Sequence, residues 1–292
     1  MTRAGRTDFR QPPAAALVAT GAFSVQFGAA LATKLFDRVG PAGAVTLRLG
    51  IAALVLAAVA RPRFRSMRRR DLGVAIAFGL VLAGMNLCFY EAIARIPLGV
   101  AVTIEFSGPL ALALFGSRRW LDLVWAVLAG TGVALFTSGG GGHLDPVGIA
   151  FAFLAGAGWI GYILLSKETG RRFDARTGLG IAMVSGTVAV LPLGLAAGGV
   201  GLFHLDALLL GGAVAMLSSV VPYSLELVAL RQVTPRAFGV LLSMDPAVAA
   251  AAGFAILGQH LTGRDLLALV LVSGANLGNA LTGRPGVVAT TP

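Results

Sequence analysis

The sequence predicts an all-α membrane protein with ten transmembrane helices, arranged as two inverted five-helix repeats. Three observations lead to this prediction. The 292-residue chain is 57% hydrophobic and 12% charged, whereas a soluble domain carries roughly 25% charged residues. Ten apolar stretches are each long enough to cross a bilayer, which takes about 20 residues. Finally, segments in the first half of the chain have counterparts in the second half.

The ten apolar stretches are separated by short connections that hold Gly, Pro or Arg. Several connections are too short to separate independent domains, so we expect one bundle of helices. The predicted spans lie near residues 14–34, 42–60, 72–94, 97–117, 120–138, 146–166, 177–199, 207–229, 236–257 and 264–282.

Basic residues predict the orientation, because Lys and Arg favour the cytoplasmic side of a membrane. With the N-terminus inside, eighteen of them fall in cytoplasmic segments and four at external helix ends, while Arg48 lies within the second span. Arg greatly outnumbers Lys, which indicates a GC-rich, bacterial genome. We therefore expect a multi-pass protein of the bacterial inner membrane with both termini cytoplasmic. The net charge of +10 reflects this topology and does not indicate a nucleic-acid partner.

The two halves of the chain resemble each other. "GAALATK" at 28–34 aligns with "GYILLSK" at 161–167, and residues 92–110 align with residues 229–247, which pairs Pro109 with Pro246. Five helices is an odd number, so the second copy must enter the membrane upside down. Inverted repeats around a midplane site are typical of secondary transporters. The predicted divisions are a first repeat at 1–138, a linker at 139–145, a second repeat at 146–282 and a cytoplasmic tail at 283–292.

Motifs for catalysis and for cofactors are missing from the sequence. It contains one cysteine, Cys88, three scattered histidines, and no Walker loop, GxSxG or HExxH pattern. We expect no metal, no cofactor and no catalytic residue. An intramembrane enzyme or a non-transporting membrane partner remains the alternative from another class, but an enzyme should carry a nucleophile, a dyad or a metal cluster at membrane depth.

Several stretches resemble the drug/metabolite transporter superfamily, EamA type. They are "TLRLGIAALVL" (46–56), "AGWIGYILLSK" (157–167) and "LGQHLTGRDLLAL" (257–269), where Gln259 stands at a position that is usually glutamate in that family. Within the superfamily, "SVQFGAALATKLF" (24–36), "PLGVAVTIEFSGPLALALFGSRR" (97–119), "PYSLELVAL" (222–230) and "FGVLLSMDPAVAA" (238–250) resemble the threonine/homoserine exporters.

The resemblance implies a secondary active transporter that exports small neutral amino acids by proton antiport with alternating access. The expected partners are a small-molecule substrate, protons and membrane lipid. Another metabolite, a nucleoside or a drug is the alternative cargo. Gly274 and Gly278 form a GxxxG pattern in the last span, which serves either a homodimer or packing within a monomer.

Carboxylates at membrane depth are the main candidates for substrate binding or proton coupling. An ionised group at the bilayer centre costs about 2.5–3.5 kcal/mol and usually faces a cavity or a partner. Glu105 lies eight residues beyond Pro97, roughly 12 Å into the membrane. It is either a carboxylate of the central site or a buried protonated carboxyl hydrogen-bonded to a neighbouring helix. Burial in apolar surroundings disfavours the ionised form, which would also suit Glu105 to carry a proton.

Three other carboxylates have more than one interpretation. Asp245 directly precedes Pro246 in the ninth span and either reaches the central site or caps a broken helix. Glu91 precedes Arg95 by four residues, the favourable order for an ion pair within a helix. Glu226, near the inner end of the eighth span and close to Arg231, is expected to be a gate or interface residue.

Arg48 needs an anionic partner, because arginine stays charged under ordinary conditions. The partner is either Glu105 or Glu91, as a structural counter-ion, or the carboxylate of a substrate. Uncharged polar and aromatic side chains within the spans line a polar cavity or, taken singly, form interhelical hydrogen bonds or packing contacts. These candidates are Asn86, Tyr90, Gln26, Tyr223, Trp159 and Asn276.

Overall fold

The structure is a computed structural model that describes residues 14–60, 68–115, 119–137, 144–229, 232 and 235–282. Within these residues the chain is helical and contains no strand. The helices of the first half are α1 (Ala14–Ala32), α2 (Phe36–Ala60), α3 (Arg69–Ile93), α4 (Leu98–Glu105), α5 (Ser107–Phe115) and α6 (Trp120–Thr137). Those of the second half are α7 (Pro146–Gly170), α8 (Ala175–Gly198), α9 (Leu205–Ala215), α10 (Val221–Ala229), α11 (Pro235–Leu242), α12 (Asp245–Leu257) and α13 (Gly263–Thr282).

Seven helical stretches in the described part of the chain are long and apolar enough to cross a membrane. The first of them, Ala15–Ala58, spans 44 residues and turns within α2 at Gly40, whose φ of 67° favours glycine, followed by Pro41. Two further apolar helical stretches, Leu98–Ala113 and Trp120–Phe136, are shorter. The chain is therefore a multi-pass helical membrane protein, as the sequence predicts.

Local capping explains where several helices begin and end. The Asp145 side chain accepts a hydrogen bond from Val147 N (2.8 Å) at the start of α7, where Pro146 occupies the first turn. Gly258, directly after the end of α12, adopts the left-handed conformation that commonly ends a helix. Thr262 and Asp265 then form a reciprocal capping pair at the start of α13.

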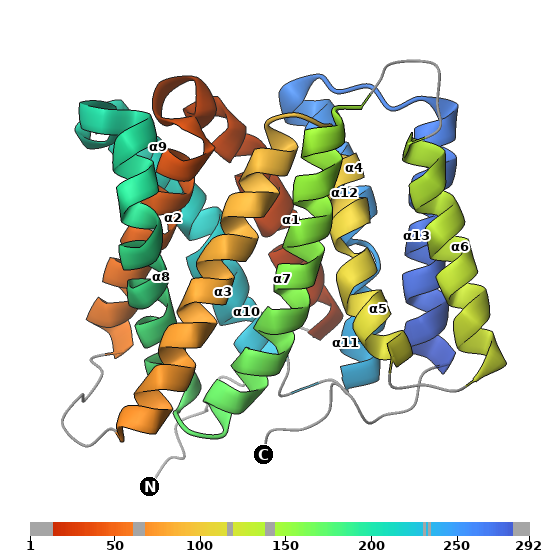
Figure 1. The fold of residues 1–292 in the computed structure, drawn as a ribbon, viewed down its shortest axis with the longest axis horizontal. Helices are drawn as coiled ribbons and strands as arrows, with labels where there is room; N and C mark the ends of the chain where they lie inside the picture. Colours follow the sequence, from red (N-terminus) through yellow and green to blue (C-terminus); the bar gives the residue numbers. More distant parts are fainter. Residues whose placement is uncertain are drawn as a thin grey trace, which may run out of the picture.

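The helices pack in matched pairs from the two halves of the chain (Figure 1). Helix α3 packs against α7 and α8 of the second half. In the corresponding way, α10 packs against α1 and α9 packs against α2 of the first half. Helices α2 and α8, α4 and α12, and α6 and α13 pair with each other across the bundle. Most of the bundle is thus built from contacts between the two halves.

Several helix ends that carry basic residues lie at one end of the bundle, drawn at the bottom of Figure 1. This end holds the starts of α3 and α6 and the end of α7, with Arg69, Arg119 and Arg172. Arg172 there bonds Asp71 (2.9 Å) and Glu168, which ties the start of α3 to the end of α7. At the opposite end of the same two helices, Arg95 pairs with Glu91 of α3. The Arg95 Nε atom also lies 3.8 Å from the Asp145 Oδ2 atom at the start of α7, which links the two helices there.

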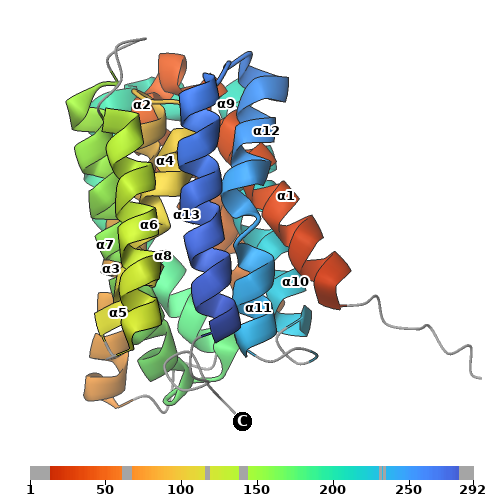
Figure 2. The ribbon, with the colours of Figure 1, turned by 90° about the vertical axis from the view of Figure 1, so that its right-hand side faces the viewer.

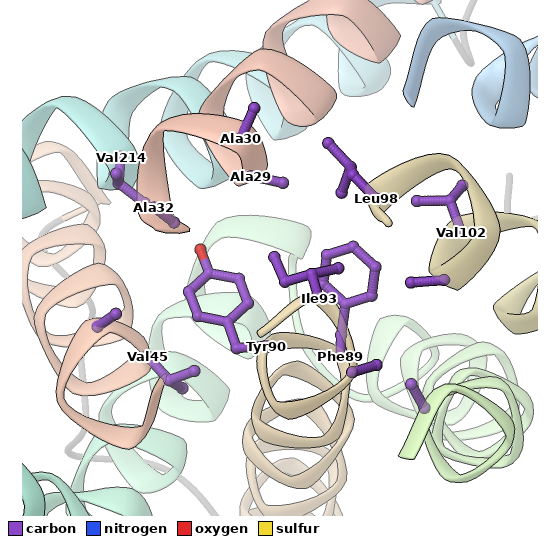
Figure 3. Packing of buried hydrophobic residues seen from close by; sticks show 14 of the residues in the cluster. Ala29, Ala30, Ala32, Val45, Phe89, Tyr90, Ile93, Leu98, Val102 and Val214 are labelled. Carbon is purple, nitrogen blue, oxygen red and sulfur yellow. The ribbon is translucent and has the colours of Figure 1, made fainter. Parts of the chain in front are cut away.

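The buried core lies where α1, α2, α3, α4 and α9 meet. Figure 3 shows Tyr90 among Ala32, Val45 and Ile93, with Leu98 and Val102 of α4 close to Phe89. Many large apolar side chains of the outer helix faces are exposed, including those of Leu54, Leu123 and Val188. Apolar surface of this extent matches helices whose surroundings are lipid.

Candidate functional site

Two spans are broken near their middle, and each break carries a buried carboxylate. α4 ends at Glu105 and α5 begins at Ser107, while α11 ends at Leu242 and α12 begins at Asp245. Both carboxylate residues are 8% exposed. α4 and α12 pack so closely that a Cβ on Gly99 would lie 2.9 Å from the Ala250 Cα atom. The sequence places these two carboxylates in separate predicted spans, and the structure packs the two helices that carry them against each other.

The break at Glu105 has a local cause. Pro109 has no N–H to donate to the Glu105 carbonyl four residues earlier, so the helical hydrogen bond that would span the break is missing. The break packs directly against the backbone of α7: a Cβ on Gly156 would lie 2.8 Å from the Glu105 carbonyl oxygen. Phe106 and Trp159 stack edge to face at this crossing, with ring centroids 4.7 Å apart.

The third irregular span contains the partners of Arg48. Between α9 and α10 the chain forms a π-helical segment, η4 (Met216–Val220). Arg48 Nε donates to Ser219 Oγ (3.1 Å), and Arg48 Nη2 donates to the Ser218 carbonyl oxygen (2.8 Å). From α3, Tyr90 Oη accepts from Arg48 Nη1 (3.4 Å), and its ring lies 5.7 Å from the guanidinium. The Arg48 residue is 6% exposed.

The Arg48 and Glu105 charges lie within electrostatic range of each other without pairing directly. Glu105 interacts over this longer range with both Arg48 and Asp245, and Arg48 also interacts with Tyr223. Among the described residues, no carboxylate lies within 4.0 Å of the Arg48 guanidinium, and the Glu105 side chain forms no hydrogen bond. The structure thus brings Arg48, Tyr90, Tyr223, Glu105 and Asp245 into one buried polar region.

The other predicted candidates lie in varied positions. Asn86 and Asn276 donate to carbonyl oxygens of their own helices, at Leu82 and Val272. Gln26 is buried in α1, and its Oε1 atom has no hydrogen-bond partner among the described residues. Glu226 lies in α10, and Arg231, its expected neighbour, lies outside the described residues.

Contacts in the structure decide two of the sequence predictions. Glu91 forms the ion pair with Arg95 that the four-residue spacing predicts, which confirms that prediction. Gly278 of the GxxxG pattern lies beneath the Trp125 indole of α6, where a Cβ would come within 2.4 Å of the ring. Gly278 therefore serves packing inside the bundle.

Sequence reasoning missed Ser218 and Ser219 as partners of Arg48. The available signal was Pro222, which has no N–H for the Ser218 carbonyl four residues earlier and so leaves it free to accept from Arg48. It also missed the place of Gln259, whose Oε1 accepts from Leu98 N (3.0 Å) at the start of α4. Within the described residues, no group of three His, Cys, Asp or Glu could hold a metal ion.

Comparison with known proteins identifies the family. The EamA-like transporter family model matches residues 146–278. The threonine/homoserine exporter RhtA of Salmonella typhimurium strain SL1344 is 44% identical over 262 residues, which cover 89% of this chain and 88% of that protein. The chain belongs to the EamA-like transporter family. Membership places it among transporters and not among enzymes, and it implies a small-molecule substrate.

One further relative and one solved structure also match this chain. The threonine/homoserine exporter RhtA of Escherichia coli strain K12 is 43% identical over 264 residues, covering 89% of each chain. One solved structure, described only as a crystal structure of a protein, matches with a TM-score of 0.63 and 19% identity. The match covers 92% of this chain and 96% of the chain in that structure, and the likeness shows a shared fold.

Proposed function

We propose that this EamA-family protein exports small neutral amino acids of the threonine/homoserine type from the bacterial cytoplasm, driven by proton entry. The observation that carries the proposal is the 43–44% identity, over 89% of the chain, to proteins named as threonine/homoserine exporters. The buried polar region agrees with such a cargo, because a zwitterion needs a cationic partner and an anionic partner. Arg48 supplies a buried cation, and Glu105 and Asp245 supply buried carboxyl groups.

The proposed topology has ten crossings in two inverted repeats, with the divisions at 138, 145 and 282 and both termini in the cytoplasm. It is supported by the matched packing of helices from the two halves. It is also supported by Ala15–Ala58, which at 44 residues is long enough for two crossings of about 20 residues each. The end of the bundle that carries Arg69, Arg119 and Arg172 then faces the cytoplasm.

Alternating access is the proposed transport cycle, in which the central region opens to one side of the inner membrane at a time. The two mid-span breaks support it, because discontinuous helices near the midplane are the usual place of substrate and ion sites in inverted-repeat transporters. Proton coupling would use Glu105 or Asp245, since an acidic group that is alternately protonated and ionised links proton entry to cargo release. Whether one chain or a homodimer forms the working unit is separate from this cycle.

Transport in proteoliposomes tests the proposal. Vesicles that contain the purified protein and labelled threonine or homoserine are diluted into buffer with and without an imposed pH gradient. Efflux above that of empty vesicles, accelerated by the gradient, is the expected result. Efflux that ignores the gradient would remove proton coupling and keep the cargo, while no efflux from folded protein would remove the cargo and redirect the search to other metabolites.

A Glu105→Gln variant tests whether the Glu105 carboxylate takes part in proton coupling. Glu105→Gln keeps the size and hydrogen-bonding capacity of the side chain but cannot ionise. We expect it to abolish the acceleration by the pH gradient, and Glu91→Gln, which alters the Arg95 ion pair at the helix end, serves as the matched control. Gradient-driven efflux that is equal in Glu105→Gln and unmodified protein would remove Glu105 from the coupling step.

A further inference from the structure

The Arg48 guanidinium is held in place by neutral groups. Its three bonded acceptors are the Ser219 hydroxyl, the Ser218 carbonyl and the Tyr90 hydroxyl. None of these acceptors carries a negative charge at neutral pH. The Arg48 residue is 6% exposed, and the protein orients its guanidinium without a carboxylate within 4.0 Å among the described residues.

The acceptors exist because the eighth span is distorted. In the π-helical segment, Val221 N bonds the Met216 carbonyl, five residues back, which leaves the Leu217 carbonyl free to accept from Ser24 Oγ (2.6 Å). Pro222 leaves the Ser218 carbonyl free in the same way, and Arg48 takes it. Single π-helical turns within α-helices occur frequently at functional sites. Here the distortion turns backbone carbonyls toward α1 and α2.

Counting donors shows what the guanidinium still offers. Arginine has five N–H groups, one on Nε and two on each terminal nitrogen. The protein uses the single donor of Nε, one donor of Nη1 and one donor of Nη2. One N–H therefore remains on each terminal nitrogen. A guanidinium can bind the two oxygen atoms of one carboxylate through two N–H donors.

Glu105 offers the opposite charge. Its residue is 8% exposed, and its side chain has no hydrogen bond or ion pair with any described residue, although the Arg48 charge acts on it at longer range. A buried carboxylate without a direct partner is costly unless a cation or a proton joins it. An α-amino acid carries the two matching charges on groups attached to the same carbon atom, so one molecule would satisfy both residues.

We propose that Arg48 and Glu105 form a two-point receptor for the zwitterion, with the α-carboxylate bound by the spare donors of Arg48 and the α-ammonium bound by Glu105. This inference rests on the proposed function and deepens it by assigning the cargo's charged groups. It makes the α-carboxylate and the α-ammonium obligatory, and it leaves the cargo's side chain to be read by other residues. Because a proton on Glu105 removes the ammonium's partner, proton and cargo bind the same group alternately.

An analogue panel tests the receptor in unmodified protein. Full-length protein in proteoliposomes exchanges labelled threonine while each unlabelled competitor is added: threonine, threonine amide, N-acetylthreonine and 2,3-dihydroxybutanoate. The amide lacks the carboxylate, and the other two lack the ammonium. We expect only threonine to compete at low concentration, with the half-inhibitory concentration of each analogue raised about tenfold or more, the size of losing a charge-assisted bond pair.

Arg48→Lys separates carboxylate recognition from simple charge balance. Lysine keeps the positive charge but replaces the planar fork with a single ammonium. If Arg48 binds the α-carboxylate, KM for threonine should rise about tenfold or more, which is the result we expect. If Arg48 is only a structural counter-ion to Glu105, lysine preserves that role and KM should stay the same. Arg38→Lys, at an exposed ion pair with Asp206, is the matched control.

Ser219→Ala offers a second variant in case Arg48→Lys does not fold. It removes only the acceptor of Arg48 Nε and leaves the charge in place. We expect KM to rise with little change in kcat, because the fork loses part of its orientation. The thermal unfolding midpoint in detergent reports folding for every variant.

The outcomes separate the receptor from the proposed function. Threonine exchange that is blocked equally by threonine and its amide, or unchanged KM in folded Arg48→Lys, would overturn the receptor and leave amino-acid export standing. Exchange of no α-amino acid by folded, unmodified protein would overturn the proposed function and the receptor together. Selective competition by threonine combined with raised KM in Arg48→Lys would support both.

Discussion

In the proposed pair of repeats, Leu98–Glu105 aligns with Pro235–Leu242, yet the surroundings of these two segments differ. Every residue of the first segment, α4, is buried, whereas the described side chains of the second segment, α11, are only half-buried. α4 packs closely on α12, but within the described residues α5 and α11 share no comparable packing, and Figure 2 shows these two helices apart. The bundle is tightly closed at the α4 end and looser at the α11 end.

In terms of the proposed repeats, the different burial of α4 and α11 is an asymmetry of the conformation. If the repeats were in equivalent states, aligned residues would be equally buried. In an alternating-access cycle the two segments would exchange surroundings, with α11 becoming buried as α4 is released. With the proposed orientation, the conformation described here is closed toward the outside.

The largest expected effect concerns side-chain truncation at aligned positions. Ile104 in α4 is fully buried, and the aligned Leu241 in α11 is half-buried. Ile104→Ala should lower the free energy of unfolding by about 2–5 kcal/mol, because it leaves a cavity in a packed region. Leu241→Ala should cost about 1 kcal/mol. Unfolding titrations in mixed micelles measure both, and equal losses would mean that the two segments are packed alike.

A second expectation concerns chemical accessibility at another aligned pair. Val102 is 1% exposed, while Gly239 is half-buried and a Cβ there would meet only Ala280 at 3.6 Å. In a Cys88→Ser background, Gly239→Cys should react with a water-soluble maleimide faster than Val102→Cys. Labelling from each side of the membrane in turn also reports orientation. Faster reaction at Val102→Cys would place the resting protein in the opposite state.

The smallest expected effect comes from the tie between Gln259 and α4. Gln259→Ala removes the acceptor of the Leu98 N–H, and such a hydrogen bond contributes about 1 kcal/mol. The loss should shift the equilibrium between the closed conformation and one in which α4 is released about fivefold toward the released form. Gln259→Glu keeps an acceptor and is the control. The readout is the labelling rate of Val102→Cys, which should rise with Gln259→Ala alone. An unchanged rate would show that this bond does not hold the α4 end closed.

The helical content and the membrane-spanning stretches followed from the sequence, because long apolar runs leave few alternatives in lipid. The interruptions of those helices did not. Prolines at 109, 222 and 246 were visible, yet a proline only releases a carbonyl, and tertiary contacts decide what replaces the lost bond. At Ser218 the replacement is Arg48, 170 residues away in the sequence. The spacing of residues along one helix carries no record of such a partner.

The candidate residues show the same limit. The Glu91–Arg95 pair was predictable because both residues lie on one helix, four positions apart. The sequence supplied Arg48 and Glu105 as separate buried charges, but their separation in space depends on how α2 and α4 are placed in the bundle. Gln26 and Asp245 were candidates because they lie within predicted spans, and position along a span does not give the direction in which a side chain points.

The ion pairs at the two ends of α3 and α7 bear on how this polypeptide can be divided. Arg95 with Asp145, and Arg172 with Asp71, join a helix of the first half to a helix of the second half. Each half therefore leaves much of its packing surface uncovered until the other arrives. If the gene were split between α6 and α7, the two fragments should accumulate only when they are produced together. In this bundle the packing surface of each half is completed by the other half.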